Sequence, residues 1–157
     1  MMMIYDDGFW ANNVNTSIGD LIDAFPKLMN EFSFVLITSL DSSNELDRDK
    51  MIRETSLPHS FLGNGVLFEA KLIPELGRLD GFFSGFDEIW CYKQKITIPK
   101  PKEVYFIGPY SPTKPISNPV KQWMRESQCI LGLGDGVGLN YITSERRIAD
   151  LIERELE

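Results

Sequence analysis

Apolar side chains recur at helical spacing in the first third of the chain. Within residues 18–29 they stand three or four positions apart, as on one face of a helix. Ser17 precedes this run and Asp20 follows three residues later, which is a short version of the capping box. Pro26 is expected to kink the helix or to end its first part. The pattern predicts an amphipathic helix that begins after Ser17.

Two more helices are predicted in the last third. Asn118 can cap a helix whose first position is Pro119, where the missing N–H costs nothing. Residues 145–157 carry an apolar stripe at helical spacing, and either Thr143 or Ser144 can cap them.

Continuous apolar runs predict the strands. Residues 32–40 are β-rich and apolar throughout, which is typical of a central strand buried on both faces. Residues 86–92 and 104–108 also favour strands. Between these runs, residues 42–54 are polar and predict a surface helix or a mobile connection.

The middle of the chain contains a loop and a further helix by the same criteria. Residues 58–65 have the composition of a loop, and residues 66–79 predict a helix interrupted near Pro74. There is no internal repeat. The sequence therefore predicts one α/β (α+β) domain, residues 1–157, with a mixed sheet of about five strands packed by about four to five helices.

Four glycines alternate within residues 130–142 and raise the question of a cofactor loop. A dinucleotide loop needs the spacing G-x-G-x-x-G between a strand and a helix, and the third glycine position falls on Val137 or Leu139 instead. Asp135-Gly136 between apolar runs predicts a β-hairpin with a two-residue turn, in which the glycine face lets another chain segment approach closely. No cofactor is predicted.

Composition bounds the class of protein. The chain has 157 residues, is 43% hydrophobic and 25% charged, and contains no apolar run long enough for a membrane span. The N-terminus lacks a signal-peptide pattern, so a cytoplasmic location is expected. Cys91 and Cys129 are then expected to be reduced and buried.

The residues that usually carry catalysis are sparse. His59 is the single histidine, and the two cysteines lack paired-ligand spacing, which disfavours a zinc site or a catalytic triad. Glu69 and Lys71 have the E-x-K spacing of some nucleases, but they fall in the predicted helix, where positions two apart diverge. No catalytic or metal-binding residue is predicted.

Charge is unevenly distributed along the chain. The net charge is -7, yet residues 91–128 hold seven lysines or arginines and two acids. This basic strip could contact RNA, but the acidic remainder repels polyanions, so no nucleic-acid partner is predicted. An acidic surface favours a cationic protein partner, or it serves solubility alone.

The segment at residues 85–92 combines acids with aromatic side chains. On a strand, Glu88, Trp90 and Tyr92 share one face, while Asp87 lies on the other. If that first face is exposed, it forms an interaction surface of a kind found at protein interfaces. The alternative is that Trp90 is buried under a helix and Glu88 marks the end of the strand.

The sequence GFDEIWCY, residues 85–92, resembles the small cytoplasmic immunity proteins of bacterial polymorphic toxin systems, including contact-dependent growth inhibition. Several of these carry a similar Gly-Phe-Asp-Glu-Ile-aromatic strand after a helix and before a segment that contains proline. The resemblance implies a single-domain, non-catalytic protein that neutralises a toxin, often a nuclease, by covering its active site.

The leading hypothesis is thus an immunity protein that binds a cationic toxin. The predicted partner-binding residues are Asp80, Asp87, Glu88, Trp90, Tyr92 and Asp135, together with acids of the C-terminal helix. Changing Asp87 and Glu88 to lysine is expected to weaken capture and leave the fold intact. The alternatives are an enzyme whose carboxylates or metal site assemble from distant segments and a regulatory domain that binds some other protein.

Overall fold

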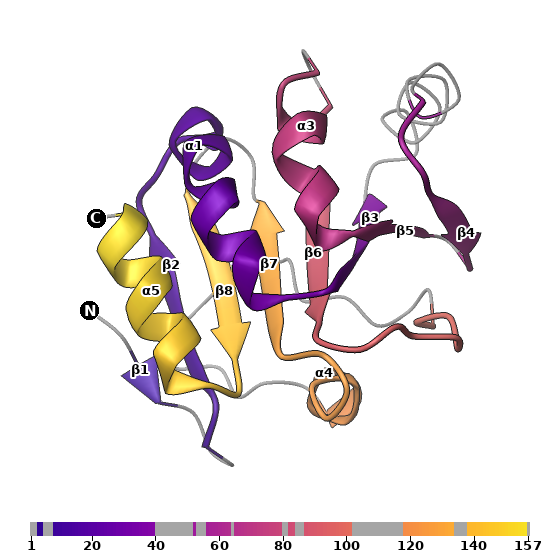
Figure 1. Ribbon diagram of the computed structural model, residues 1–157. Coiled ribbons are helices and arrows are strands. Elements are labelled where there is room, and N and C mark those ends of the chain that lie inside the picture. Colours follow the sequence, from indigo (N-terminus) through magenta and orange to yellow (C-terminus); the bar gives the residue numbers. More distant parts are fainter. Residues whose placement is uncertain are drawn as a thin grey trace.

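The chain folds around one antiparallel sheet with helices on both faces (Figure 1). The computed structural model describes residues 3–4, 8–39, 52, 56–63, 65–79, 82–83, 87–101, 118–133 and 138–156. The strands are β1 (Met3–Ile4), β2 (Trp10–Val14), β3 (Phe34–Ser39), β4 (Ser60–Leu62), β5 (Gly65–Glu69), β6 (Asp87–Tyr92), β7 (Cys129–Leu133) and β8 (Leu139–Thr143). The helices are α1 (Ile18–Leu28), α3 (Ile73–Gly77), α4 (Asn118–Trp123) and α5 (Arg146–Leu156), with short 3-10 turns η2 (Met29–Glu31) and η3 (Ala70–Leu72).

The sheet is larger and more regular than the sequence predicts. Its order is β1-β2-β8-β7-β6-β3-β5-β4, and every neighbouring pair is antiparallel. The prediction of a mixed sheet of about five strands is therefore wrong on both points. The α/β class and the four α-helices among the described residues agree with the prediction. None of these helices has the length and apolar character needed to cross a membrane.

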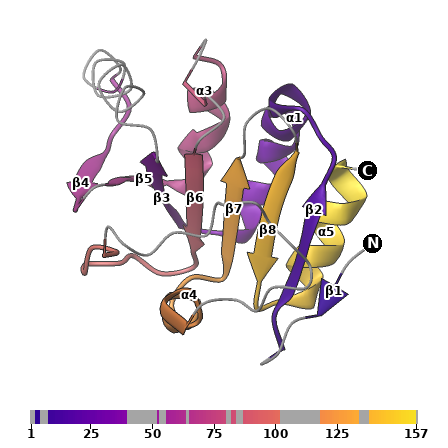
Figure 2. The same cartoon turned by 180° about the vertical axis from the view of Figure 1, so that it is seen from behind.

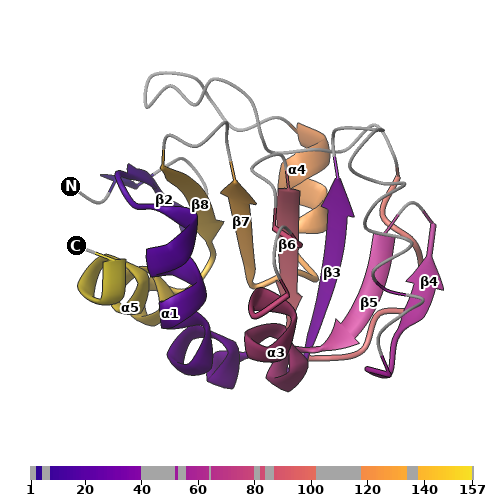
Figure 3. The same ribbon diagram turned by 90° about the horizontal axis from the view of Figure 1, so that it is seen from above.

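The sheet separates two apolar layers. Helices α1, α3 and α5 cover one face, and α4 lies on the other (Figure 3). The larger layer, between the sheet and α1, includes the fully buried Phe25 of that helix. The smaller layer, between the sheet and α4, includes Trp90 and Tyr92 of β6. Strand β3 lies in the interior of the sheet, and Val35, Leu36 and Ile37 are all almost fully buried, as its continuous apolar run predicts.

Helix α1 begins as its sequence predicts. The Ser17 hydroxyl accepts a hydrogen bond from the Asp20 backbone N–H at 3.0 Å, and it donates one to the Asp20 carboxylate at 2.8 Å. The first contact satisfies a backbone N–H of the first turn that would otherwise lack an intrahelical partner, and the second holds the capping hydroxyl in place. Pro26 lies in the last turn, and the backbone tightens into η2 directly after Leu28.

Residues 58–79 depart from the prediction of a loop and an interrupted helix. Strands β4 and β5 form a hairpin in which Leu62 pairs with Gly65, so that two residues connect them. Gly63 has a φ of +62°, a conformation that glycine adopts without strain. Pro74 then lies in the first turn of α3 rather than interrupting a longer helix.

The predicted hairpin between β7 and β8 is confirmed, and the pairing of its strands is known. Leu133 pairs with Leu139, whereas an uninterrupted ladder around a two-residue Asp135-Gly136 turn would place Leu133 opposite Gly138. The connection itself lies outside the described residues. Gly138 has a φ of +97°, and a Cβ atom there would stand 2.7 Å from the Val14 carbonyl oxygen. The predicted close approach of another chain segment is thus confirmed at this glycine.

Candidate functional site

The aromatic–acidic face of β6 is buried. Glu88, Trp90 and Tyr92 share one face of the strand, as predicted, but each is 0% exposed. Ile96, Val120 of α4 and Met124 directly after that helix pack in the same apolar layer. The prediction that this face forms an exposed interaction surface is therefore wrong, because α4 and the segment after β6 cover it.

Of the three other acids predicted as partner contacts, Asp87 lies within the described residues. Asp87 is the first residue of β6 and pairs with Ser39. Asp80 and Asp135 lie outside the described residues. Glu88 is 0% exposed and accepts from the Trp90 indole, so a lysine at position 88 would bury a charge without that partner and is expected to destabilise the fold.

A row of polar positions crosses the sheet on the face that α4 covers. Cα pairing places Thr38 opposite Glu88, Glu88 opposite Gly132, Gly132 opposite Asn140, and Asn140 opposite Asn13. The Asn13 side-chain amide donates to the side-chain oxygen Oδ1 of Asn140 at 2.6 Å. Thr38 is 2% exposed, and its hydroxyl has no hydrogen-bond partner among the described residues. Sequence reasoning missed this row, although each member is a polar residue or a glycine inside an apolar strand.

Glu88 and Lys100 contact Trp90 in different ways. The Trp90 indole N–H donates to the Glu88 carboxylate at 2.8 Å, and the Lys100 ammonium lies 5.3 Å from the centre of the Trp90 ring. Lys100 is 3% exposed and also donates to the Pro101 carbonyl at 3.2 Å. The indole thus links a buried carboxylate in the sheet to the segment that covers it.

An acidic pocket lies between α1 and α5 on the opposite face. Its volume is about 490 Å³. The carboxylates in it are Asp20, Asp23 and Glu155, and the other lining residues are Asn15, Thr16, Ala24 and Leu156. The Glu155 carboxylate accepts from the Lys27 ammonium at 3.1 Å, and this hydrogen bond lowers the pKa of Glu155.

The other acids of the C-terminal helix are held by contacts within the fold. Glu153 accepts from the Asn12 amide at 2.7 Å and from the Tyr141 hydroxyl at 2.6 Å, which joins α5 to β2 and β8. Asp150 lies 3.8 Å from Arg146 one turn earlier. Of the acids predicted on this helix, Glu155 is the one that lines the acidic pocket.

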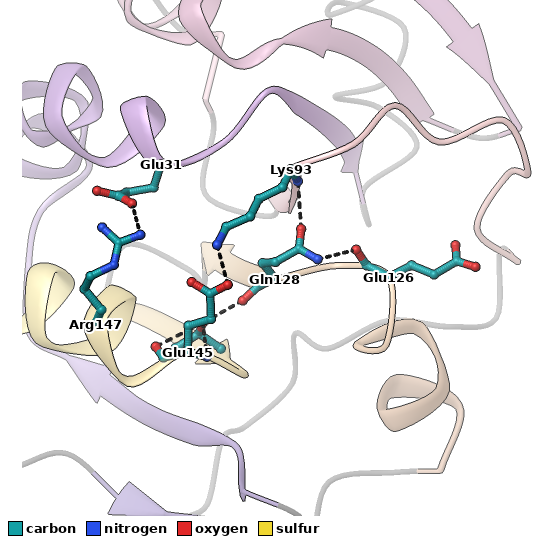
Figure 4. A network of polar contacts seen from close by, with 7 residues as sticks. Glu31, Lys93, Glu126, Gln128, Glu145 and Arg147 are labelled. Carbon is teal, nitrogen blue, oxygen red and sulfur yellow. Dashed lines mark hydrogen bonds and ion pairs between the residues drawn. The ribbon is translucent and has the colours of Figure 1, made fainter.

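At the end of the sheet away from the acidic pocket, charged residues link neighbouring elements to one another (Figure 4). The Lys93 ammonium contacts the Glu145 carboxylate, and the Lys93 backbone N–H donates to the Gln128 side chain at 2.7 Å. Arg147 pairs with Glu31 at 2.6 Å, and this contact raises the pKa of Arg147. These contacts hold the end of β6, the start of β7 and the first turn of α5 together.

The two cysteines face each other across β6 and β7. Cys91 pairs with Cys129, both side chains are fully buried, and neither forms a disulfide, as predicted. Burial, followed by the contact with Cys129, raises the pKa of Cys91 well above its ordinary value. The thiol therefore stays protonated at neutral pH and is a poor nucleophile.

The other residues considered for catalysis have ordinary structural contacts. His59 Nδ1 lies 2.9 Å from the Leu57 carbonyl oxygen, and its ring packs against Phe61 and Phe68. Glu69 and Lys71 form an exposed ion pair of 3.2 Å. The described residues include no group of three or more histidines, cysteines or acids that could hold a metal ion.

Comparison with family models, with curated proteins and with solved structures gave no match for this chain. Its function is therefore inferred from the chemistry of these sites.

Proposed function

We propose that this chain is a non-catalytic immunity protein that binds a cationic nuclease toxin and neutralises it by covering the toxin's active site. The net charge of -7 supports a cationic partner, because opposite charges accelerate encounter. The resemblance of residues 85–92 to immunity proteins supports the same class. A nuclease active site attracts phosphates, and carboxylates of an inhibitor can take their place.

The acidic pocket between α1 and α5 is the observation that carries this proposal. Asp20 and Asp23 come from α1, three positions apart, and Glu155 comes from the C-terminal turn of α5. The negative end of the α5 dipole and the positive end of the α1 dipole both lie at this pocket, so the attraction for a cation comes from the three carboxylates.

The acids of this pocket differ in availability. Asp23 is exposed and makes no ion pair among the described residues. Asp20 shares its carboxylate with the Ser17 hydroxyl, and Glu155 shares its own with Lys27. A lysine or arginine of the toxin would thus meet one unpaired carboxylate and two that can accept further hydrogen bonds.

The test begins with the gene immediately upstream. Its product is expressed with and without this chain, and restored growth of the host supports neutralisation. Association of the two purified proteins is then measured over a series of salt concentrations. A rate that falls steeply as salt rises is expected if charge steers the encounter. A product without toxicity, or toxicity that this chain does not relieve, would contradict the proposal.

Two charge-matched variants locate the interface. Asp20→Asn with Asp23→Lys keeps a capping side chain at position 20 and changes the net charge by three units. Glu126→Gln with Glu75→Lys makes the same change at exposed sites outside the acidic pocket. The first variant is expected to slow association by about tenfold and the second by less than about twofold, since steering acts locally at physiological salt. Equal effects would remove the pocket from the interface.

A carboxylate-based enzyme remains the second candidate, and the buried polar row favours it. Glu88 lies in this row directly opposite Thr38, and Asn140 stands two strands away, beyond Gly132. A buried carboxylate beside hydrogen-bonding side chains can act as a general base. Glu88→Gln separates the two functions: it should abolish turnover in an enzyme, whereas toxin neutralisation should persist.

A further inference from the structure

A second pocket lies on the face of the sheet opposite the acidic pocket. Residues 93–98 leave the end of β6 and run toward β4, and residues 125–128 connect α4 to β7 (Figure 2). Between these two segments is a cavity of about 520 Å³, a size within the range of roughly 300–1,000 Å³ that small-molecule sites occupy. This pocket, which we call the basic pocket, plays no part in the proposed function.

The basic pocket carries positive charge in an acidic protein. Three cations line it, Lys93, Lys95 and Arg125, against the single carboxylate of Glu126. Lys93 is held by Glu145, whereas Lys95 and Arg125 form no ion pair within the described part of the chain. An arginine and a lysine without acidic partners at one concave surface favour an anion, and the guanidinium can bind a phosphate through two parallel hydrogen bonds.

The remaining walls suit an organic molecule rather than a bare ion. Ile96 is largely buried in the apolar layer beneath, while Ile98 is 65% exposed and is one of two large apolar side chains exposed among the described residues. Gln94, Thr97 and Gln128 add amide and hydroxyl groups. Apolar surface beside a few convergent polar groups is the usual composition of a ligand site.

The charge of the whole chain limits the size of the anion. Outside residues 91–128 the chain holds nine bases and 21 acids, so a long polyanion would extend from the basic pocket onto a predominantly acidic remainder. A small anion is confined to the pocket, where charges within a Debye length of about 8 Å dominate at physiological salt. The favoured ligand therefore carries one phosphate group and fits within the pocket.

We propose that the basic pocket binds a small phosphorylated organic molecule of the size of a nucleoside monophosphate. The phosphate lies between Arg125 and Lys95, and the organic part rests on Ile98 with its polar groups on Gln94 and Thr97. This inference goes beyond toxin neutralisation and does not depend on it.

Calorimetric titration of the full chain tests the proposal. The probes are the four nucleoside 5′-monophosphates, the corresponding nucleosides, inorganic phosphate and a short single-stranded oligonucleotide. At least one monophosphate is expected to bind at least tenfold more tightly than both its nucleoside and inorganic phosphate. No binding by any monophosphate, or binding no tighter than that of inorganic phosphate, would overturn the proposal. Tighter binding of the oligonucleotide than of every monophosphate would also overturn it and indicate a nucleic-acid interface.

Variants place the ligand in the pocket. Lys95→Gln with Arg125→Gln should weaken monophosphate binding at least tenfold. The matched control is Lys27→Gln with Arg78→Gln, which removes the same two charges at exposed positions that do not line the basic pocket, and it should change binding less than twofold. Thermal unfolding of both variants verifies that each is folded. Equal binding by the two variants would show that the ligand lies elsewhere and would refute the assignment.

Discussion

The hydrogen bond between Trp90 and Glu88 predicts a large and specific loss of stability. The indole N–H donates to the carboxylate at 2.8 Å, and both side chains are 0% exposed. Trp90→Phe removes the donor and leaves that carboxylate oxygen without it. A hydrogen bond to a charged group contributes about 1.5–3 kcal/mol, and the smaller ring adds a cavity cost of about 1 kcal/mol. Weaker attraction of Lys100 to a phenyl ring adds about 0.5 kcal/mol. The expected loss is about 3–4.5 kcal/mol.

The chain offers a matched control for this substitution. Trp10 has a buried indole N–H with no hydrogen-bond partner among the described residues. Trp10→Phe makes the same chemical change but removes an unpaired donor, so the expected cost is about 1 kcal/mol or less. The free energy of unfolding is measured by urea denaturation for both variants, and unchanged slopes confirm that the transitions are comparable.

A double-mutant cycle isolates the hydrogen bond from the change in volume. The cycle combines Trp90→Phe with Glu88→Met, and contacts that Glu88 makes with other groups cancel between its two arms. The coupling energy is expected to be about 1.5–3 kcal/mol. A coupling below about 0.5 kcal/mol would refute the reasoning, because it would mean that the carboxylate is as well satisfied without the indole as with it.

Two other substitutions test single features of the sheet. Gly138→Ala should destabilise the protein by about 1–3 kcal/mol, because Gly138 has a φ of +97° and a Cβ atom would stand 2.7 Å from the Val14 carbonyl oxygen. Gly19→Ala is the control: its Cβ would meet nothing closer than the Ser17 hydroxyl at 3.7 Å, so urea denaturation should show a gain of about 0.5–1 kcal/mol. A Gly138→Ala variant as stable as the original chain, or more stable, would mean that the strain at position 138 is absent. Tyr92→Phe removes a buried hydroxyl that has no partner among the described residues, and it should leave stability at neutral pH unchanged or slightly raised. Burial raises the pKa of Tyr92, so its contribution is present below the ordinary tyrosine pKa of about 10 and is lost as the pH rises above it. The variant should therefore lose less stability than the original chain in alkaline unfolding experiments, and a parallel decline in both would contradict this.

The helices and the central strand could be predicted because local sequence decides them. Ser17 and Asp20 form a cap within one turn, and the apolar run in β3 exceeds what a half-exposed strand needs. Strand β5 could not be predicted in the same way. Val66, Leu67 and Phe68 are consecutive apolar residues, which fit a buried strand and a buried helix equally well. Residues 65–69 form a strand because the chain reverses at Gly63 and β5 then pairs with β4.

The candidate sites were harder to predict, because exposure depends on which elements cover each strand face. Alternation along β6 correctly groups Glu88, Trp90 and Tyr92 on one side. It contains no information on the packing of residues 96–101 and α4, which lie far apart in sequence and together bury that side. The basic pocket likewise joins residues on both sides of α4, and composition alone indicates only that the region is basic.

The two pockets can act independently because the sheet lies between them. The acidic pocket is built on α1 and α5, which cover one face, and the basic pocket lies beside α4 on the other (Figure 3). The charges of the two pockets lie on opposite faces of the sheet, and salt screens their interaction over a Debye length of about 8 Å. Asp20→Asn with Asp23→Lys should therefore slow toxin association without changing monophosphate affinity, and Lys95→Gln with Arg125→Gln should do the reverse. A change in both properties by either variant would mean that one partner spans both faces or that binding at one pocket alters the sheet.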